Sequence, residues 1–227
     1  MDIKSFKKSI YKEMADVTKA LGNPNRLEIL DLLAQGSCSV EYIADQTNLS
    51  VANASQHLQV LKNAKLVATE RKGKYSYYQL ANSHVFNSWC SLRRLALSQN
   101  AEISHLIDDF RRNQEGIQTI SSDDLIKKME TEDIMIIDVR PEEEYKKGHI
   151  RNAICFPKDM LDDNMKNLEK NKQIVAYCRG PFCMLADEAV EMLKQKGYKA
   201  ARLENGYPDW AARELPVEES AKLKLPN

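Results

Sequence analysis

The chain has 227 residues, and 33 Lys and Arg balance 33 Asp and Glu, so its formal net charge at pH 7 is zero. This length suits two domains of about 110 residues each. The aliphatic runs are too short to span a membrane and the first residues lack the apolar core of a signal peptide, so we expect a cytoplasmic protein with no membrane partner. Five irregularly spaced cysteines and scattered histidines indicate neither a disulfide framework nor a metal site, and we expect no cofactor.

The first half of the chain predicts four helices. Residues 3–21 alternate polar and apolar at helical spacing, and Asn23 and Pro24 supply the cap and first-turn proline of a second helix that ends near Ala34. Shorter helices are expected over residues 40–47 and 51–63, with Ser50 capping the latter. The tight link between these two is typical of a helix-turn-helix.

A β-hairpin is predicted next, because residues 66–72 and 74–80 alternate in strand fashion around Gly73. Its basic tip could follow a phosphate backbone, although such a tip alone is usually a solvated turn. The helix over 51–63 presents small polar side chains, which a major groove admits. We expect double-stranded DNA, an operator, to contact Ser50, Asn53, Ser55, Gln56, His57, Arg71, Lys72 and Lys74. The alternative for His57 is a hydrogen-bonded side chain on the helix surface.

Over about residues 10–112 the chain resembles the ArsR-type winged-helix repressors, in residues 20–30, 49–62 and the wing after Leu66. The resemblance implies a homodimer in which terminal helices pair, with residues 82–112 supplying the second such helix. It also implies that the polar residues of the helix over 51–63 read bases and that the wing cations hold phosphates. Metal-sensing relatives carry a Cys-x-Cys pair where this chain has only Cys38, which disfavours a metal sensor. Cys38 and Cys90 are expected to be buried structural thiols, with a redox role as the alternative.

In the second half short strands alternate with helices, which places a domain boundary near residue 116. Strands are predicted over 134–137, 153–155, 173–177 and 200–203, and helices after Ser121 and over 142–145. This order indicates a mostly parallel sheet with helices on both faces. The fold class is therefore two domains: a mainly-α winged helix-turn-helix with a β-hairpin wing, residues 1–115, and an α/β domain, residues 116–227.

Cys178 follows an apolar strand and enters a short Gly/Pro loop that leads into a helix. A helix N-terminus favours an anion placed before it. With Arg179 it would lower the pKa of Cys178 from about 8.5 to about 6.5, so we expect a solvent-facing thiolate. The alternative is an inert buried cysteine. Cys183 lies at the other rim of the loop, and a Cα separation within about 7 Å would allow a disulfide. Otherwise Cys183 packs the start of the helix.

Over about residues 117–218 the chain resembles a rhodanese domain, through motifs around Asp138, Glu144, His149, Cys178 and Gly206. The resemblance implies that Cys178 takes sulfane sulfur as a persulfide from a small donor such as thiosulfate or another persulfide. It further implies that Asp138 and Arg140 form an ion pair that supports the loop, and that His149 is structural. The loop amides that would cradle the sulfur are those of Arg179, Gly180, Phe182, Cys183 and Met184, since Pro181 has no N–H. A phosphatase would need an arginine at position 184, where this chain has methionine, so phosphatase chemistry is disfavoured.

We therefore expect a transcription regulator whose rhodanese-like domain, a thiosulfate sulfurtransferase, couples sulfur status to gene expression. Cys183 would resolve the Cys178 persulfide. Two alternatives stay open: a sulfurtransferase that uses the winged helix mainly for dimerisation, and a sensor for arsenite or another soft electrophile through Cys178 and Cys183.

Overall fold

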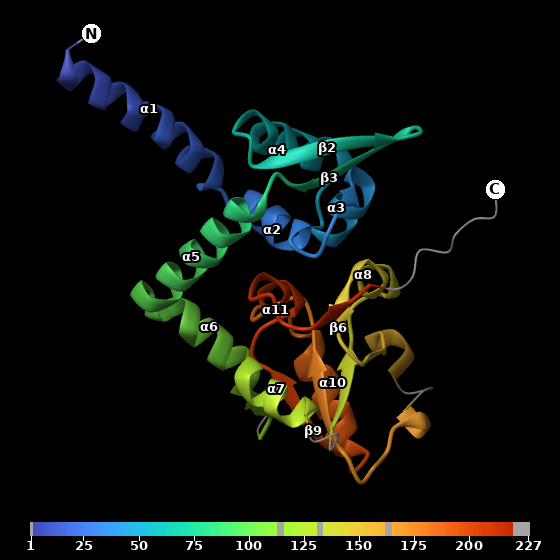
Figure 1. The fold of residues 1–227 in the computed structure, drawn as a ribbon. Helices are drawn as coiled ribbons and strands as arrows, with labels where there is room; N and C mark the ends of the chain where they lie inside the picture. The colour runs from blue at the N-terminus through green and yellow to red at the C-terminus, as the bar shows by residue number, and fades with distance from the viewer. Residues whose placement is uncertain (1, 113–115, 131–133, 162–164, 220–227) are drawn as a thin grey trace. The chain divides into compact units, whose positions relative to one another are not determined.

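The computed structural model describes residues 2–112, 116–130, 134–161 and 165–219 (Figure 1). The chain divides into two compact units, Met1–Gln99 and Asn100–Asn227. The boundary expected near residue 116 stays a prediction, and Arg111, which precedes it, contacts Pro181 and Asp187 of the second unit. None of the described helices is long and apolar enough to cross a membrane.

The first unit contains the four expected helices, the hairpin and a fifth helix within the stretch over 82–112, where a further helix was also expected. Its elements are α1 (Ile3–Leu21), α2 (Pro24–Leu33), β1 (Cys38–Ser39), α3 (Val40–Gln46), α4 (Val51–Asn63), β2 (Val67–Lys72), β3 (Tyr75–Leu80) and α5 (Ser83–Gln99). The caps follow the sequence: Asn23 Oδ1 accepts from Arg26 N at 3.2 Å, and Ser50 Oγ accepts from Asn53 N at 3.2 Å.

The wing is a three-stranded antiparallel sheet in the order β1-β3-β2. Gly73 and Lys74 join β2 to β3, and Gly73 has φ +62°, a conformation that glycine adopts without steric cost. Behind the sheet, side chains from α2, α3 and α4 form one core, in which Ile29, Ile43 and Leu58 are fully buried. The core holds the helix-turn-helix against the wing.

Helix α1 extends away from the other elements of the first unit (Figure 1). Its one buried residue is Ala20. Its exposed side chains include a set of large apolar ones: Ile3, Phe6, Ile10, Tyr11, Met14 and Val17. This spacing of three and four residues places most of them on one face of the helix.

The second unit begins with α6 (Ala101–Arg112), separated from α5 by Asn100. Its other elements are β4 (Gln118–Ile120), α7 (Ser122–Met129), β5 (Ile134–Asp138), α8 (Glu142–Lys147), β6 (His149–Ile150), β7 (Ala153–Cys155), the short 3₁₀ helices η1 (Lys158–Met160) and η2 (Met165–Asn167), β8 (Gln173–Tyr177), α10 (Leu185–Gln195), β9 (Lys199–Leu203), α11 (Tyr207–Ala212) and β10 (Val217–Glu218).

Five of these strands form a parallel sheet in the order β4-β9-β8-β5-β7, while β10 and β6 pair antiparallel. Along β8, Ile174 and Ala176 belong to one buried cluster, and Val175 and Tyr177 belong to another. Since successive side chains of a strand point to opposite faces, both faces of the central strand are covered.

Candidate functional site

Cys178 is the first residue after β8, next to the end of β5, so it lies at the carboxyl edge of the parallel sheet. Ligand and catalytic sites of open parallel sheets occur at this edge. Tyr177 O accepts a hydrogen bond from Val139 N at 3.1 Å, and Cys178 O accepts one from Tyr207 N at 3.1 Å. The backbone at Cys178 is therefore fixed by two neighbouring connections.

The structure contains a disulfide between Cys178 and Cys183, with a Cα separation of 6.4 Å. Cys178 is only 3% exposed and belongs to the same buried cluster as Val139 and Phe156. Our expectation of a solvent-facing Cys178 is wrong for this state, because the loop folds back and bonds Cys183 to it. The expected lowering of the Cys178 pKa applies only to the reduced state, since a disulfide sulfur carries no titratable proton.

The loop from Cys178 to Cys183 closes as a tight turn in which Gly180 O accepts from Cys183 N at 3.1 Å. In this state the Cys183 amide is thus occupied rather than aimed at a bound sulfur. Phe182 is 39% exposed at the surface of the turn. A Cβ at Gly206 would lie 2.2 Å from the carbonyl carbon of Arg179, so the connection before α11 approaches the loop as only glycine allows.

Arg179 does not offer an unbalanced positive charge to the loop. Its Nε lies 3.0 and 3.1 Å from the two carboxylate oxygens of Glu144, and its Nη2 donates to Glu144 Oε1 at 2.6 Å. Glu144 is on α8 and its side chain is 1% exposed. The positive charge of Arg179, which was expected to lower the pKa of Cys178, is therefore largely balanced by the carboxylate of Glu144. No role was predicted for Glu144 from the sequence.

Asp138 and Arg140 form a fully buried ion pair with Nη2 2.6 Å from Oδ2. Arg140 Nη2 also donates to Gly148 O at 2.7 Å, and its guanidinium lies 4.4 Å from the centre of the Tyr207 ring. Tyr177 donates its hydroxyl to Asp138 Oδ2 at 2.6 Å, and burial together with that carboxylate raises the Tyr177 pKa well above its ordinary value. This network joins the ends of β5 and β8 to Gly148 and to the first residue of α11.

His149 is 5% exposed and held by Tyr145. Its Nδ1 donates to Tyr145 O at 3.0 Å, and the two rings stack with centroids 3.8 Å apart. The ring thus packs beneath α8, an arrangement that suits a structural histidine.

Arg111 of α6 also reaches the cysteine loop, a contact that the sequence analysis missed. Its Nη2 donates to Pro181 O at 3.0 Å, and its Nε lies 3.4 Å from Asp187 Oδ1 on α10. Arg202 Nε lies 3.3 Å from the same oxygen. Residues 111 and 181 are far apart in the chain, so no local pattern could have indicated this contact.

In the first unit, Ser55 and Gln56 of α4 are exposed, while Ser50 caps the helix. Ala54, Leu58 and Leu61 are buried on the opposite side, so the polar face of α4 is open. Asn53 is half-buried. His57 is also half-buried, and its Nε2 accepts from Asn25 Nδ2 at 3.2 Å.

The wing cations Arg71, Lys72 and Lys74 are exposed at the tip of the β2–β3 hairpin. Lys72 Nζ lies 3.1 Å from Glu70 Oε2, and Lys74 Nζ lies 5.2 Å from the centre of the Tyr75 ring. These are surface contacts, which water and other charges readily replace.

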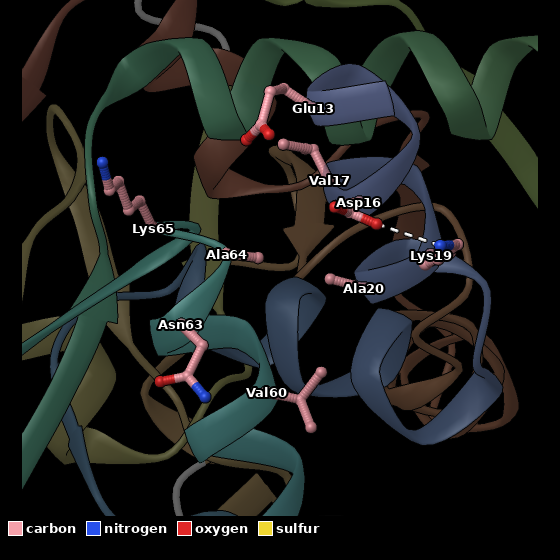
Figure 2. Close-up of a pocket in the computed structure, with 9 residues that line it drawn as sticks. All are labelled: Glu13, Asp16, Val17, Lys19, Ala20, Val60, Asn63, Ala64 and Lys65. Carbon is pink, nitrogen blue, oxygen red and sulfur yellow. Dashed lines mark hydrogen bonds and ion pairs between the residues drawn. The ribbon is translucent and has the colours of Figure 1, made fainter. Parts of the chain in front are cut away.

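A cavity of about 490 Å³ lies between the ends of α1 and α4 (Figure 2). Its lining includes Glu13 and Val17 from α1 and Val60 from α4, and Asp16 forms an ion pair with Lys19 at 2.9 Å on its rim. None of the residues that we expect to contact DNA lines it. Because Val17 also belongs to the exposed apolar set of α1, the cavity adjoins that set.

Both halves of the chain match known families. Residues 23–69 match the family described as bacterial regulatory protein, arsR family, and residues 121–213 match the rhodanese-like domain. Over 103 residues the chain is 29% identical to a protein named sulfurtransferase from Allochromatium vinosum, covering 44% of this chain and 94% of that protein. A solved homodimeric winged helix-turn-helix DNA-binding domain, Mb0332 from Mycobacterium bovis, is 39% identical with a TM-score of 0.40, covering 41% of this chain and 87% of that one.

One similarity covers nearly the whole chain. Over 217 residues the sequence is 37% identical to the HTH-type transcriptional regulator Rv0324 of Mycobacterium tuberculosis, covering 96% of this chain and 95% of that protein. The match therefore spans both units and the segment that joins them. The chain belongs to the family of HTH-type transcriptional regulators that includes Rv0324, and it is an ArsR-type transcriptional regulator fused to a rhodanese-like domain.

Proposed function

We propose that this regulator binds operator DNA as a homodimer and that Cys178 accepts sulfane sulfur, so that sulfur status controls gene expression. The observation that carries the proposal is the Cys178–Cys183 pair at the carboxyl edge of the sheet of a rhodanese-like domain. The similarity to a protein named sulfurtransferase supports the chemistry. The donor is a small molecule with a sulfane sulfur, thiosulfate or a persulfide.

DNA binding is supported by the open polar face of α4 and the exposed cations of the wing. Asn53, Ser55 and Gln56 would read bases in the major groove, with His57 held in place by Asn25. The wing cations would contact phosphates and make the affinity depend on salt. Homodimerisation is supported by the exposed apolar set of α1, which a second copy would cover.

The chemistry begins with the reduced pair. The Cys178 thiolate attacks the outer sulfur of the donor, and the donor leaves as sulfite or as a thiolate, which gives a Cys178 persulfide. The Cys183 thiol then loses its proton and attacks Cys178 Sγ, so that an S–S bond forms between the cysteines and the outer sulfur leaves as hydrosulfide. The two thiols supply the two electrons that reduce the sulfane sulfur. A low-molecular-weight thiol or a protein dithiol resets the pair.

Intact mass spectrometry with a hydrosulfide assay tests this scheme. After treatment of the reduced protein with a sulfane-sulfur donor, the parent chain should become two hydrogen atoms lighter and release hydrosulfide. Cys183→Ser should instead become one sulfur atom heavier, and Cys178→Ser should do neither. If Cys183→Ser gives the same product as the parent chain, the resolving role of Cys183 is wrong.

The same pair also suits a soft electrophile, because two thiols within disulfide distance can bind one arsenite. The products separate the two functions. Arsenite would protect both thiols from alkylation without oxidising them, whereas a persulfide donor would convert the two thiols into the disulfide. A failure to bind DNA even at low salt would favour the remaining alternative, a sulfurtransferase that uses the winged helix for dimerisation.

A further inference from the structure

Arg111 holds two segments that flank Cys183. Its Nη2 donates to the carbonyl of Pro181, which lies inside the loop that the disulfide closes, at 3.0 Å. Its Nε lies 3.4 Å from Asp187 Oδ1 in the first turn of α10. One planar guanidinium therefore joins the end of α6 to both sides of the reactive loop.

Arg111 shares its contact with Asp187 with a second arginine, whereas its hydrogen bond to Pro181 reaches the cysteine loop itself. Arg202 Nε lies 3.3 Å from the same Asp187 oxygen, so this buried carboxylate keeps a cation when Arg111 is absent. Burial raises the pKa of Asp187, and both arginines act in the opposite direction. What Arg111 adds is the bond from α6 to the backbone of the cysteine loop.

In the disulfide state the Pro181 carbonyl lies in a closed loop. The disulfide fixes both loop ends, and the hydrogen bond from Cys183 N to Gly180 O closes the turn around Pro181. Reduction releases Cys183 from Cys178 and removes that covalent constraint. The acceptor that Arg111 binds is therefore fixed in the disulfide state and freer in the dithiol state.

We propose that Arg111 couples the thiol state of the Cys178–Cys183 pair to the docking of α6 against the rest of the second unit. The proposal deepens the proposed function and rests on it for its biological meaning. Helix α6 follows α5 after a single residue, and the first unit ends with α5. A change in the docking of α6 therefore changes the segment that connects the two units. By linkage, a disulfide that favours docking must itself be favoured by docking to the same extent.

Hydrogen exchange of the full chain, measured by mass spectrometry, tests the coupling. The disulfide is formed with diamide and the dithiol with a phosphine reductant, and the exchange of the α6 amides is compared. We expect exchange at least about five-fold slower in the disulfide state. In Arg111→Gln this difference should disappear. No difference in the parent chain, or the same difference in Arg111→Gln, would overturn the proposal.

Two controls separate coupling from simple loss of structure. Arg213→Gln removes another arginine of the second unit, one that pairs with Asp123, and should keep the full difference between the two states. Arg111→Lys keeps a cation beside Asp187, which protects folding, but lacks the fork that binds two acceptors at once. It should lose most of the difference, and retention of the full difference in this variant would also contradict the proposal.

The design keeps this proposal apart from the persulfide chemistry. Diamide forms the disulfide without sulfane sulfur, so a failed hydrosulfide assay leaves the exchange result intact. Cys183→Ser cannot form the disulfide, so the exchange rate of its α6 amides should be the same with and without diamide. The reciprocal readout is the thiol-disulfide equilibrium in a thiol buffer, which Arg111→Gln should shift toward the dithiol by the same factor as it changes exchange. An unchanged equilibrium would contradict the coupling.

Discussion

The two units use charge in opposite ways. In the wing of the first unit, Arg71, Lys72 and Lys74 are exposed, and Lys72 contacts the exposed carboxylate of Glu70. Around the cysteine loop of the second unit, Arg140 and Arg179 are paired with the buried carboxylates of Asp138 and Glu144. Exposed cations remain available to an external polyanion, whereas paired cations fix the protein around them. The position of a cation thus indicates whether it serves binding or architecture.

Removing one partner of a buried ion pair should have the largest effect on stability. Arg140→Met leaves the fully buried Asp138 carboxylate without its main partner, and should destabilise the second unit by about 3–5 kcal/mol. Urea unfolding of the full chain, followed by near-UV signals of each unit, measures this. Lys72→Met in the wing is the matched control and should cost no more than about 1 kcal/mol. Equal effects of the two changes would remove the distinction.

The buried carboxylates should also act on neighbouring thiols. Burial and Asp138 raise the pKa of Cys155 to about 11. A raised thiol pKa lowers the thiolate fraction below that pH, so alkylation of Cys155 at pH 8 should be more than about 100-fold slower than that of a free cysteine. The rate should rise steadily toward pH 11. Peptide mapping after iodoacetamide measures it, and a rate at pH 8 equal to that in urea would contradict the prediction.

The close approach of Gly206 to the loop gives a smaller effect. Gly206→Ala places a methyl group against the backbone of Arg179 and Gly180, and should destabilise the second unit by about 1–3 kcal/mol. A matched glycine occurs in the first unit. At Gly22 an added Cβ meets its nearest atom, Thr18 O, at an ordinary 3.7 Å, so Gly22→Ala should be tolerated. Thermal unfolding measures the loss of stability in both variants. A larger loss in Gly22→Ala than in Gly206→Ala would contradict the prediction, because it would mean that the cysteine loop can move to accept the added methyl group.

The smallest stability effect, with a clear functional one, is expected in the wing. Arg71→Ala with Lys74→Ala should leave stability within about 1 kcal/mol, since these side chains are exposed. If each cation contacts one phosphate, the slope of log affinity for operator DNA against log salt should fall by about 2. Fluorescence anisotropy over a salt series measures it, with Lys199→Ala of the second unit as control. An unchanged slope would place the DNA elsewhere.

Local patterns predicted most of the fold. The caps at Asn23 and Ser50 and the apolar stretches over 134–137 and 173–177 carry their signals within a few residues, and the elements begin and end close to the expected positions. The two-residue strands β1, β6 and β10 were not predicted, because they exist only through their pairing partners. The stretch over 82–112 also contains two helices, α5 and α6, rather than one continuous helix.

The site was predicted less completely than the fold. Cys178 and Cys183 could be singled out because they flank one short loop, and Asp138 and Arg140 because they are two residues apart. Arg179 and Glu144 are separated by 35 positions, and Arg111 and Pro181 by 70. Such pairs depend on the packing of distant elements and leave no periodic signal in the sequence. For the same reason the loop alone could not decide between a solvent-facing Cys178 and the buried alternative.

Whether sulfur status controls DNA binding is decided by the affinity of the full chain for its operator, measured at fixed salt for the reduced protein before and after treatment with a persulfide donor. We expect a change of at least about five-fold in the parent chain, reversed by a thiol reductant, and no change in Cys178→Ser. The same affinity before and after treatment, with mass spectrometry showing complete conversion of the cysteine pair, would contradict it.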